Sequence, residues 1–167
     1  MMGIDRQSII KTVYGDLAGN TKPLDSLVYY PADASYKTDF HKWNYNPVKA
    51  LALLKKHCTG GPATPSSGNS AILTCSGLPA KFRFTWTASN ATRTTQEAII
   101  KAQLKSIGIE IVDASLPANV VFGPTGIPGS TSDLADFALV TAAAPASFMA
   151  ARRLGGRGDY LQHAQPQ

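Results

Sequence analysis

Apolar residues recur at helical spacing in residues 92–112, and this segment has the clearest pattern of the chain. Ile100, Leu104 and Ile107 follow one another at intervals of four and three residues. Because a helix completes a turn in about 3.6 residues, this spacing places all three side chains on one face. The pattern predicts an amphipathic helix over residues 94–107.

Both ends of this helix contain residues that favour a helix terminus. Thr94 and Glu97 have the spacing of a capping box, which satisfies amides that the first turn leaves unpaired. Gly108 follows the apolar face and can adopt the left-handed conformation that ends a helix. Glu97 and Lys101 lie four residues apart, which predicts an ion pair on the solvent side.

Strand patterns lie on either side of the helix. Residues 81–87 alternate polar residues with three aromatic ones, as a half-buried strand does: Phe82, Phe84 and Trp86. Residues 109–113 and the apolar run Asp136–Ala142 predict two further strands. If the first two pair in parallel, the connection through the helix is expected to be right-handed. The expected fold class is α/β, with a small mixed sheet, a βαβ unit and flanking helices.

Two more helices are expected before this unit. The first covers Ile4–Tyr14 and ends at Gly15. The second begins at Asn46-Pro47, where asparagine is a favoured cap and proline fits the first helical position. It is expected to end within residues 57–60, and its apolar stripe consists of Val48, Leu51 and Leu54.

The remaining segments are expected to be irregular or short. Gly, Pro, Ser and Tyr are frequent in three long loops, at residues 18–44, 59–77 and 117–132. A short helical turn is expected at Asn119–Phe122 and a short helix at residues 147–153. The tail from residue 155 has no periodicity and is expected to be frayed.

Composition and charge bound the class of protein. The 167 residues are 44% hydrophobic and 16% charged, which is typical of one globular domain. The net charge of +5 is spread over the chain, and its densest clusters are only Lys55-Lys56 and Arg152-Arg153. The positive charge is therefore interpreted as charge scattered over the surface and not as a sign of an anionic partner. No nucleic-acid partner is expected.

The start of the chain has no signal-peptide pattern, because the first residues lead directly into the first predicted helix. No apolar run approaches the ~20 residues that cross a bilayer. These observations leave two interpretations: a protein of the cytoplasm, or a piece cut from a longer exported protein.

Cys58 and Cys75 lie 17 positions apart, on either side of a Gly/Pro/Ser-rich loop. An even cysteine count around such a loop favours a disulfide that closes it, and two free thiols are the alternative. His57 lies beside Cys58, but no second spaced pair of ligands accompanies them. No metal site and no cofactor are therefore expected.

Sequence signatures of catalysis are weak. No Gly-x-Ser-x-Gly elbow is present, and His41, His57 and His163 lie in unrelated contexts, where solvent exposure is expected. Residues 123–130 superficially resemble a phosphate loop but lack its lysine. No catalytic residue is predicted, and the protein is not expected to be an enzyme. Residues 157–159 spell an Arg-Gly-Asp tripeptide, and Asn90-Ala91-Thr92 is a glycosylation sequon that matters only in a eukaryotic secretory host.

Four motifs, in order, resemble those of one family. GIDRQSIIKTVYG at residues 3–15, YNPVKALALL at 45–54, EAIIKAQLKSIGIEI at 97–111 and DLADFAL at 133–139 are similar to successive motifs of family 5 extracellular solute-binding proteins. These proteins are the oligopeptide-, dipeptide- and nickel-type receptors of ABC importers. The resemblance implies part of the second lobe of a two-lobed, type II periplasmic-binding-protein-like fold. Residues 1–150 are expected to form that partial lobe and residues 151–167 an irregular tail.

The resemblance also implies where a ligand would bind. The carboxyl end of the strand at residues 137–141 and the loop after it are expected to face the ligand, through the backbone of Thr141, Ala142 and Ala143. Alternatively, Thr141 merely ends a core strand. The stretch 142–147 has no acidic residue, although dipeptide-type members bind the ammonium of their ligand with one there. Trp86 is expected to pack in the core in preference to stacking on a ligand.

The function implied is that of a fragment of an ABC-importer receptor, which captures peptides or similar small solutes outside the cytoplasm together with permease subunits. A disulfide suits that oxidising compartment. The alternative is a free-standing α/β protein-interaction module. For a fragment, an exposed apolar face is expected where the rest of the receptor would join, and this face would allow self-association.

Overall fold

The computed structural model describes residues 1–15, 19, 21–26, 29–66, 71–127 and 133–136. The chain forms two compact units. The first consists of Met1–Pro23 and Trp43–Phe137, and the second of Leu24–Lys42 and Ala138–Gln167. All of the strands and the three longest helices described below belong to the first unit.

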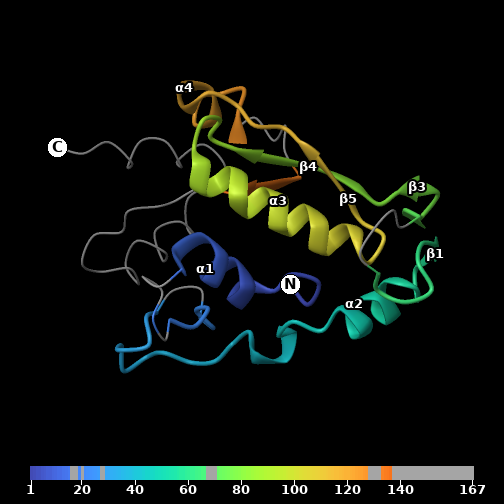
Figure 1. Cartoon of the computed structure of the whole chain (residues 1–167), viewed down its shortest axis with the longest axis horizontal. Coiled ribbons are helices and arrows are strands. Elements are labelled where there is room, and N and C mark those ends of the chain that lie inside the picture. The colour runs from blue at the N-terminus through green and yellow to red at the C-terminus, as the bar shows by residue number, and fades with distance from the viewer. Residues whose placement is uncertain (16–18, 20, 27–28, 67–70, 128–132, 137–167) are drawn as a thin grey trace. The chain divides into compact units, whose positions relative to one another are not determined.

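A parallel three-stranded sheet is the centre of the first unit (Figure 1). It consists of β4 (Lys81–Trp86), β5 (Glu110–Asp113) and β6 (Leu134–Asp136), in the order β5-β4-β6. The register pairs Phe82 with Ile111 and Trp86 with Asp136. The predicted βαβ unit is confirmed, and the third strand extends the same sheet. That strand begins two residues before the predicted start, and residues 137–142 of the predicted run lie outside the described residues.

Helix α3 (Ala91–Lys105) connects β4 to β5 and packs along the sheet (Figure 1). The predicted capping box is wrong, because Asn90 caps the helix: its side chain accepts a hydrogen bond from the Arg93 amide at 3.1 Å. Thr94 lies inside the first turn, where its hydroxyl donates to the Asn90 carbonyl. The predicted end at Gly108 is confirmed by a φ of 83°. The amides of Gly108 and Ile109 donate to the carbonyls of Lys105 and Leu104, as in a Schellman motif.

Glu97 forms the predicted pair with Lys101, but not on the solvent side. The carboxylate is buried, with 7% of the residue exposed, and its Oε1 lies 3.8 Å from the Lys101 ammonium. This separation is within ion-pair range but beyond hydrogen-bond range, so Oε1 has no hydrogen-bond donor. The predicted apolar face is confirmed by the burial of Leu104 and Ile107, with Ile100 half-buried beside them.

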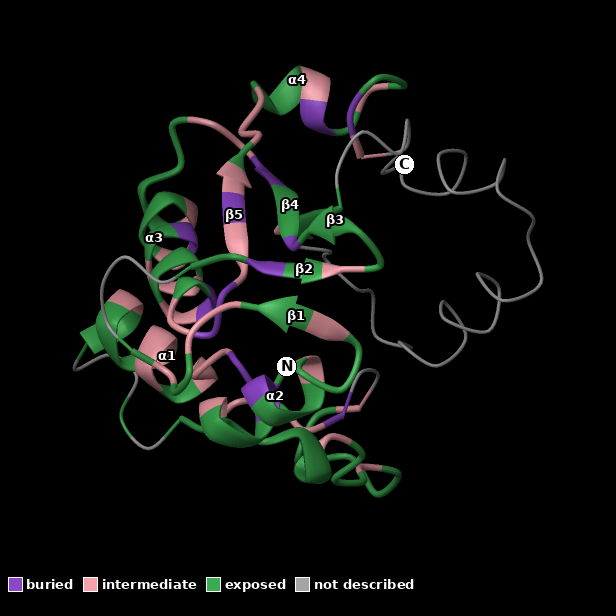
Figure 2. Ribbon diagram, turned by 90° about the vertical axis from the view of Figure 1, so that its right-hand side faces the viewer, coloured by how far each residue is buried: buried purple, intermediate pink, exposed green. Residues whose placement is uncertain are grey.

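The predicted alternation of β4 holds for only part of the strand. Phe84 and Trp86 are buried and pack against each other with ring centroids 5.6 Å apart, whereas Phe82 is 40% exposed. Thr85, expected on the solvent side, is 1% exposed. The C-terminal half of β4 is therefore buried on both faces, as Figure 2 shows.

A second, antiparallel sheet occupies the segment predicted as a loop. It consists of β1 (Cys58–Gly60), β2 (Leu73–Cys75) and β3 (Leu78–Pro79), in that order. The prediction of an irregular segment over residues 59–77 is therefore wrong at its two ends, and residues 67–70 lie outside the described residues. The predicted disulfide is confirmed: Cys58 and Cys75 are directly opposite in the β1–β2 register and are bonded, with an S–S distance of 2.00 Å.

Helix α1 (Arg6–Tyr14) packs against α3. It begins two residues later than predicted, with Asp5 as its cap, and Gly15 follows its end as expected. The Gln103 side chain joins the two helices, because its Oε1 accepts from the Asp5 amide at 2.8 Å and its Nε2 donates to the Ser8 hydroxyl at 2.9 Å.

Helix α2 (Pro47–Leu54) begins at the predicted proline, with Asn46 as its cap. It ends at Leu54, before the predicted end. Its predicted stripe is partly wrong, since Leu51 is buried but Val48 is 67% exposed. The short helix α4 (Ala118–Val121) confirms the predicted turn.

Leu73 joins the two sheets of the first unit. Its side chain is fully buried, its amide donates to the Gly108 carbonyl at 2.8 Å and its carbonyl accepts from the Ala80 amide at 2.7 Å. A Cβ added at Gly108 would lie 3.0 Å from Leu73 Cγ. The close approach of the helix end to β2 thus requires glycine for space as well as for its conformation.

The described part of the second unit, in residues 24–26 and 29–42, is mostly irregular, as predicted for residues 18–44. The Tyr36 hydroxyl accepts from the Asp25 amide at 3.1 Å, and the Phe40 amide donates to the Asp25 carbonyl at 3.2 Å. A single 3-10 turn, η2 (His41–Trp43), follows at the border with the first unit. The helix predicted at residues 147–153 and the tail lie outside the described residues.

Candidate functional site

The order of the parallel strands places a switch point at the carboxyl end of β4. The chain passes from β4 to β5 on one side and then returns to β6 on the other side of β4. The connections therefore leave the carboxyl ends of the strands in opposite directions, and the crevice between them is the usual ligand site of open α/β sheets. Residues at the ends of β4 and β6 are the candidate site.

A polar contact lies at this edge. Thr87 directly follows β4 and is joined to Leu116 by an isolated parallel bridge. Arg93, in the first turn of α3, donates from Nη1 to the Thr87 hydroxyl at 2.8 Å. Since Asn90 caps the same turn, the guanidinium is held at the carboxyl edge by both its backbone and its side chain. A guanidinium in such a place can bind a carboxylate with two parallel hydrogen bonds.

Asp136 places a negative charge at the same edge. It lies opposite Trp86, the last residue of β4, and it is half-buried. Burial raises the pKa of Asp136, and the positive charge of Arg93 opposes that rise. A half-buried carboxylate is a group that gains from a cationic partner.

An apolar cavity of about 320 Å³ adjoins Asp136. Only Gln96 and Asp136 contribute polar side chains to its wall, and the other residues that line it are Ile4, Ile9, Phe84, Ile100, Leu134 and Ala135. Apolar walls with a few polar groups are typical of small-molecule sites. The carboxyl edge of the sheet thus combines a guanidinium, a carboxylate and an apolar cavity.

The predicted site residues have different positions in the structure. Thr141, Ala142 and Ala143 lie outside the described residues, as do residues 157–159 and His163. Trp86 is 3% exposed and packs in the core, as expected. His41 and His57 are exposed, as predicted. In the phosphate-loop-like stretch, Gly126 is buried and a Cβ there would collide with the carbonyls of Val120 and Val121.

Sequence patterns did not identify Arg93, Thr87 or Asp136. The nearest signal was the expectation that the site lies at the carboxyl end of the third strand, and its residues Thr141, Ala142 and Ala143 lie outside the described residues. Within the described ranges, no cluster of three or more His, Cys, Asp or Glu could hold a metal ion. None of the described helices is long and apolar enough to cross a membrane.

The charge of Asp136 leads to a prediction about stability and pH. Because its pKa is raised above the ordinary value of 3.8, the folded protein binds more protons than the unfolded chain as the pH rises above 3.8. The free energy of unfolding contributed by this group therefore falls with rising pH. Asp136→Asn is expected to gain stability relative to the wild type between pH 3.5 and pH 7, measured by urea unfolding.

Asp133→Asn is the matched control, and its stability relative to the wild type should change with pH in the opposite direction. The Arg83 amide and guanidinium donate to the Asp133 carboxylate and lower its pKa. The free energy of unfolding that Asp133 contributes is present above pH 3.8 and is lost as the pH falls. Asp133→Asn should therefore lose stability relative to the wild type as the pH rises. Parallel pH trends for the two variants would contradict the opposed environments of the two carboxylates.

Comparison with known proteins identifies what this architecture is similar to. Residues 1–144 match the model of bacterial extracellular solute-binding proteins, family 5 middle. No curated protein matches the chain.

Solved structures of longer proteins are also similar. NikA from Brucella suis in complex with Fe(III)-EDTA has a TM-score of 0.67 at 21% identity, over 92% of this chain and 29% of that one. The oligopeptide-binding protein AppA from Bacillus subtilis with a nonapeptide has a TM-score of 0.54 at 26% identity, over 72% and 22%. An oligopeptide-binding protein from Thermus thermophilus with a pentapeptide has a TM-score of 0.56 at 22% identity, over 84% and 23%. The chain therefore spans less than a third of the length of each.

Proposed function

Because the chain belongs to family 5 of the bacterial extracellular solute-binding proteins, we propose that it is part of the second lobe of a receptor that captures a small solute for an ABC importer. Residues 1–150 are proposed to belong to that lobe and residues 151–167 to form a tail. The observation that carries the proposal is the family match over residues 1–144, together with the polar edge at the sheet's switch point. The role requires binding and lobe closure and no catalysis.

A receptor that closes over its ligand needs only part of the site on each lobe. The carboxyl edge supplies three complementary features: the Arg93 guanidinium, the Asp136 carboxylate and the apolar cavity beside it. Each of these features contributes little binding free energy while the edge is open to water. Closure of a second lobe would exclude water and strengthen both charges.

A peptide is the solute class that we propose. Its terminal carboxylate would pair with Arg93, while apolar side chains would enter the cavity beside Asp136. Thr141, Ala142 and Ala143 are proposed to pair with the peptide main chain. AppA and the Thermus thermophilus protein are described with bound peptides, and NikA with Fe(III)-EDTA, so a chelated metal is the competing ligand.

The proposed location is outside the cytoplasm, with the permease subunits of the importer as partners. The Cys58–Cys75 disulfide supports this proposal, since disulfides persist in oxidising compartments and are rare in the cytosol. The alternative function is a free-standing interaction module. Such a module would bind a protein partner and would be indifferent to peptides and chelates.

A titration tests the proposed function. Labelled protein is titrated with a pool of pentapeptides and, separately, with Fe(III)-EDTA, and amide shifts are followed by NMR. Peptides are expected to perturb Thr87, Arg93 and Asp136 first. Arg93→Gln should weaken peptide binding about tenfold, which corresponds to the loss of roughly one charge-assisted hydrogen bond.

Lys49→Gln is the matched control, because it removes the same charge from the exposed side of α2. It should leave peptide binding unchanged. If neither ligand perturbs the carboxyl edge, the receptor function is rejected. If only Fe(III)-EDTA does, the receptor function stands and the peptide proposal is wrong.

A further inference from the structure

The apolar cavity beside Asp136 lies next to the Arg93 guanidinium. Arg93, Gln96 and Ile100 follow one another at intervals of three and four residues, which places them on one face of α3. Gln96 and Ile100 line the cavity, so Arg93 lies one turn of helix before its wall. Asp136 lines the same cavity from β6. A ligand group that Arg93 holds is therefore close to the cavity.

The strand register brings the two charges of this edge together. Asp136 is level with Trp86, and Thr87, which follows Trp86, accepts the hydrogen bond of Arg93 at 2.8 Å. Neighbouring strands lie about 4.8 Å apart, so one strand spacing and one residue separate the backbone of Asp136 from that of Thr87. The charge of Arg93 accordingly acts on Asp136 and opposes the effect of burial on its pKa.

Binding of a peptide carboxylate at Arg93 changes the charge balance of this edge. Before binding, the positive charge of Arg93 balances the negative charge of Asp136. A terminal carboxylate on Arg93 adds a second negative charge, and closure of the receptor over the site would remove the water that screens it. Asp136 is half-buried, where an unbalanced charge is costly. A positive charge that the ligand itself places beside Asp136 restores neutrality.

The walls of the cavity determine which ligand group can carry that charge. Among the described residues that line it, only Gln96 and Asp136 are polar, so the part of the ligand that crosses the cavity must be apolar. A lysine side chain meets both conditions, because its methylene stem packs on apolar surface while its ammonium reaches a polar group. The side-chain oxygen of Gln96 is a second acceptor for such an ammonium.

We propose that this cavity receives the last side chain of the captured peptide and selects lysine there, with the terminal carboxylate on Arg93, the methylene stem in the cavity and the ammonium on Asp136. The carboxylate and the ammonium belong to one residue of the ligand, so both can reach neighbouring points of the edge. The selection of lysine rests on the proposed receptor function, because it concerns the same site and specifies which peptides that site prefers.

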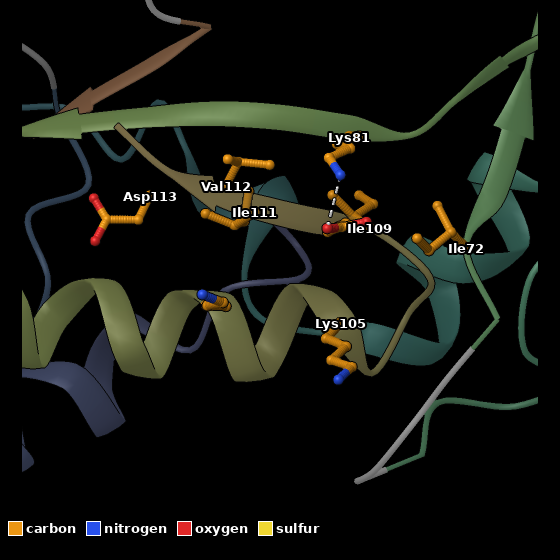
Figure 3. A pocket seen from close by; sticks show the side chains of 9 residues that line it. Ile72, Lys81, Lys105, Ile109, Ile111, Val112 and Asp113 are labelled. Carbon is orange, nitrogen blue, oxygen red and sulfur yellow. Dashed lines mark ion pairs between the residues drawn. The ribbon is translucent and has the colours of Figure 1, made fainter. Parts of the chain in front are cut away.

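The groove along β5 has a different lining (Figure 3). It has a volume of about 460 Å³, and its charged lining residues are Lys81, Lys101, Lys105, Glu110 and Asp113. The Glu110 carboxylate already lies 3.1 Å from the Lys81 ammonium. The Asp113 carboxylate accepts from the Ser115 amide at 2.7 Å. An incoming lysine would meet cations there and carboxylates that already have donors, so this groove does not favour it.

Three pentapeptides that differ only in their last residue test the selection. Each has four alanines, followed by lysine, by norleucine, which keeps the stem without the ammonium, or by acetyl-lysine, which keeps the length without the charge. NMR titrations of the 167-residue chain, read at the amides of Arg93 and Asp136, give the dissociation constants. The lysine peptide is expected to bind about tenfold more tightly than either of the others, because it alone forms a charge-assisted contact with Asp136.

Asp136→Asn is the decisive variant, and it should bring the three dissociation constants to within about twofold of one another. Glu110→Gln is the matched control, because it removes a carboxylate from the groove along β5, and it should keep the tenfold preference. Equal affinities in the wild type, or a preference that persists in Asp136→Asn, would overturn the selection of lysine and leave the peptide receptor standing. If none of the peptides perturbs the edge, both proposals fail.

Discussion

Leu73→Ala is expected to lower the free energy of unfolding by about 2–5 kcal/mol. The side chain is fully buried where β2 meets the end of α3. Truncation removes its apolar contacts and leaves a cavity between glycines that have no side chains to fill it: Gly61, where a Cβ would lie 2.7 Å from Leu73 Cγ, and Gly108. The rigid backbone on both sides limits collapse, so the cost should lie in the upper part of that range.

Urea unfolding at neutral pH measures this loss. Leu78→Ala is the matched control, since it makes the same change on β3 of the same small sheet, where Leu78 is 71% exposed. Its cost should be below about 0.5 kcal/mol, as for most surface changes. Equal losses for the two variants would show that Leu73 is not the residue that joins the sheets.

Removal of the disulfide should have the second-largest effect. Cys58 and Cys75 close a loop with a sequence separation of 17, for which the chain-entropy model gives about 3 kcal/mol. The cross-link lowers the entropy of the unfolded chain more than that of the folded one, because β1 and β2 are already paired in the fold. Cys58→Ala combined with Cys75→Ala is expected to lower the free energy of unfolding by about that amount.

Wild-type protein under reducing conditions is the control for lost side-chain packing, because both cysteines contact the core. Reduced wild type and the double alanine variant should be destabilised to a similar extent. If reduction leaves the free energy of unfolding unchanged, the cross-link does not restrict the unfolded chain. A loss confined to the alanine variant would indicate packing instead.

The βαβ unit could be predicted from sequence because its signals are local and periodic. Ile100, Leu104 and Ile107 specify the face of α3, and Gly108 its end. The start of α3 was missed because Asn90 and Thr94 are both favoured caps, and the sequence does not rank them. Asn90 directly follows the turn after β4, so the position of the strand decides between the two.

The antiparallel sheet could not be predicted, because its strands have only two or three residues. Such strands are too short to show an alternation of apolar and polar residues, and Leu73 is a single apolar residue in a Gly/Pro/Ser-rich context. The cysteines were the only signal of order there. Sequence reasoning correctly paired them but did not extend the pairing to the strands that contain them.

The candidate site depended on register, which the sequence does not specify. Arg93 and Asp136 are 43 positions apart, and only the pairing of β6 with β4 brings them to one edge. The sequence placed the site at Thr141, Ala142 and Ala143 because the apolar run continues past Asp136, and this stays a prediction because those residues lie outside the described ones. A shift of a parallel strand moves every residue along the edge, so the sequence pattern alone could not show that Asp136 and Arg93 meet there.

The position of β4 at the middle of its sheet has a consequence for synthesis on the ribosome. The central strand is made before either neighbour, and β4, α3 and β5 are complete once residue 113 has emerged. The strands of this nucleus pair across 29 residues, as Lys81 does with Glu110, whereas β6 pairs with β4 across 50, as Leu134 does with Phe84. The nucleus can therefore form first, and β6 must find an already built edge. Slowing translation after residue 113 should therefore favour productive folding, whereas a pause before β5 would leave β4 exposed to aggregation.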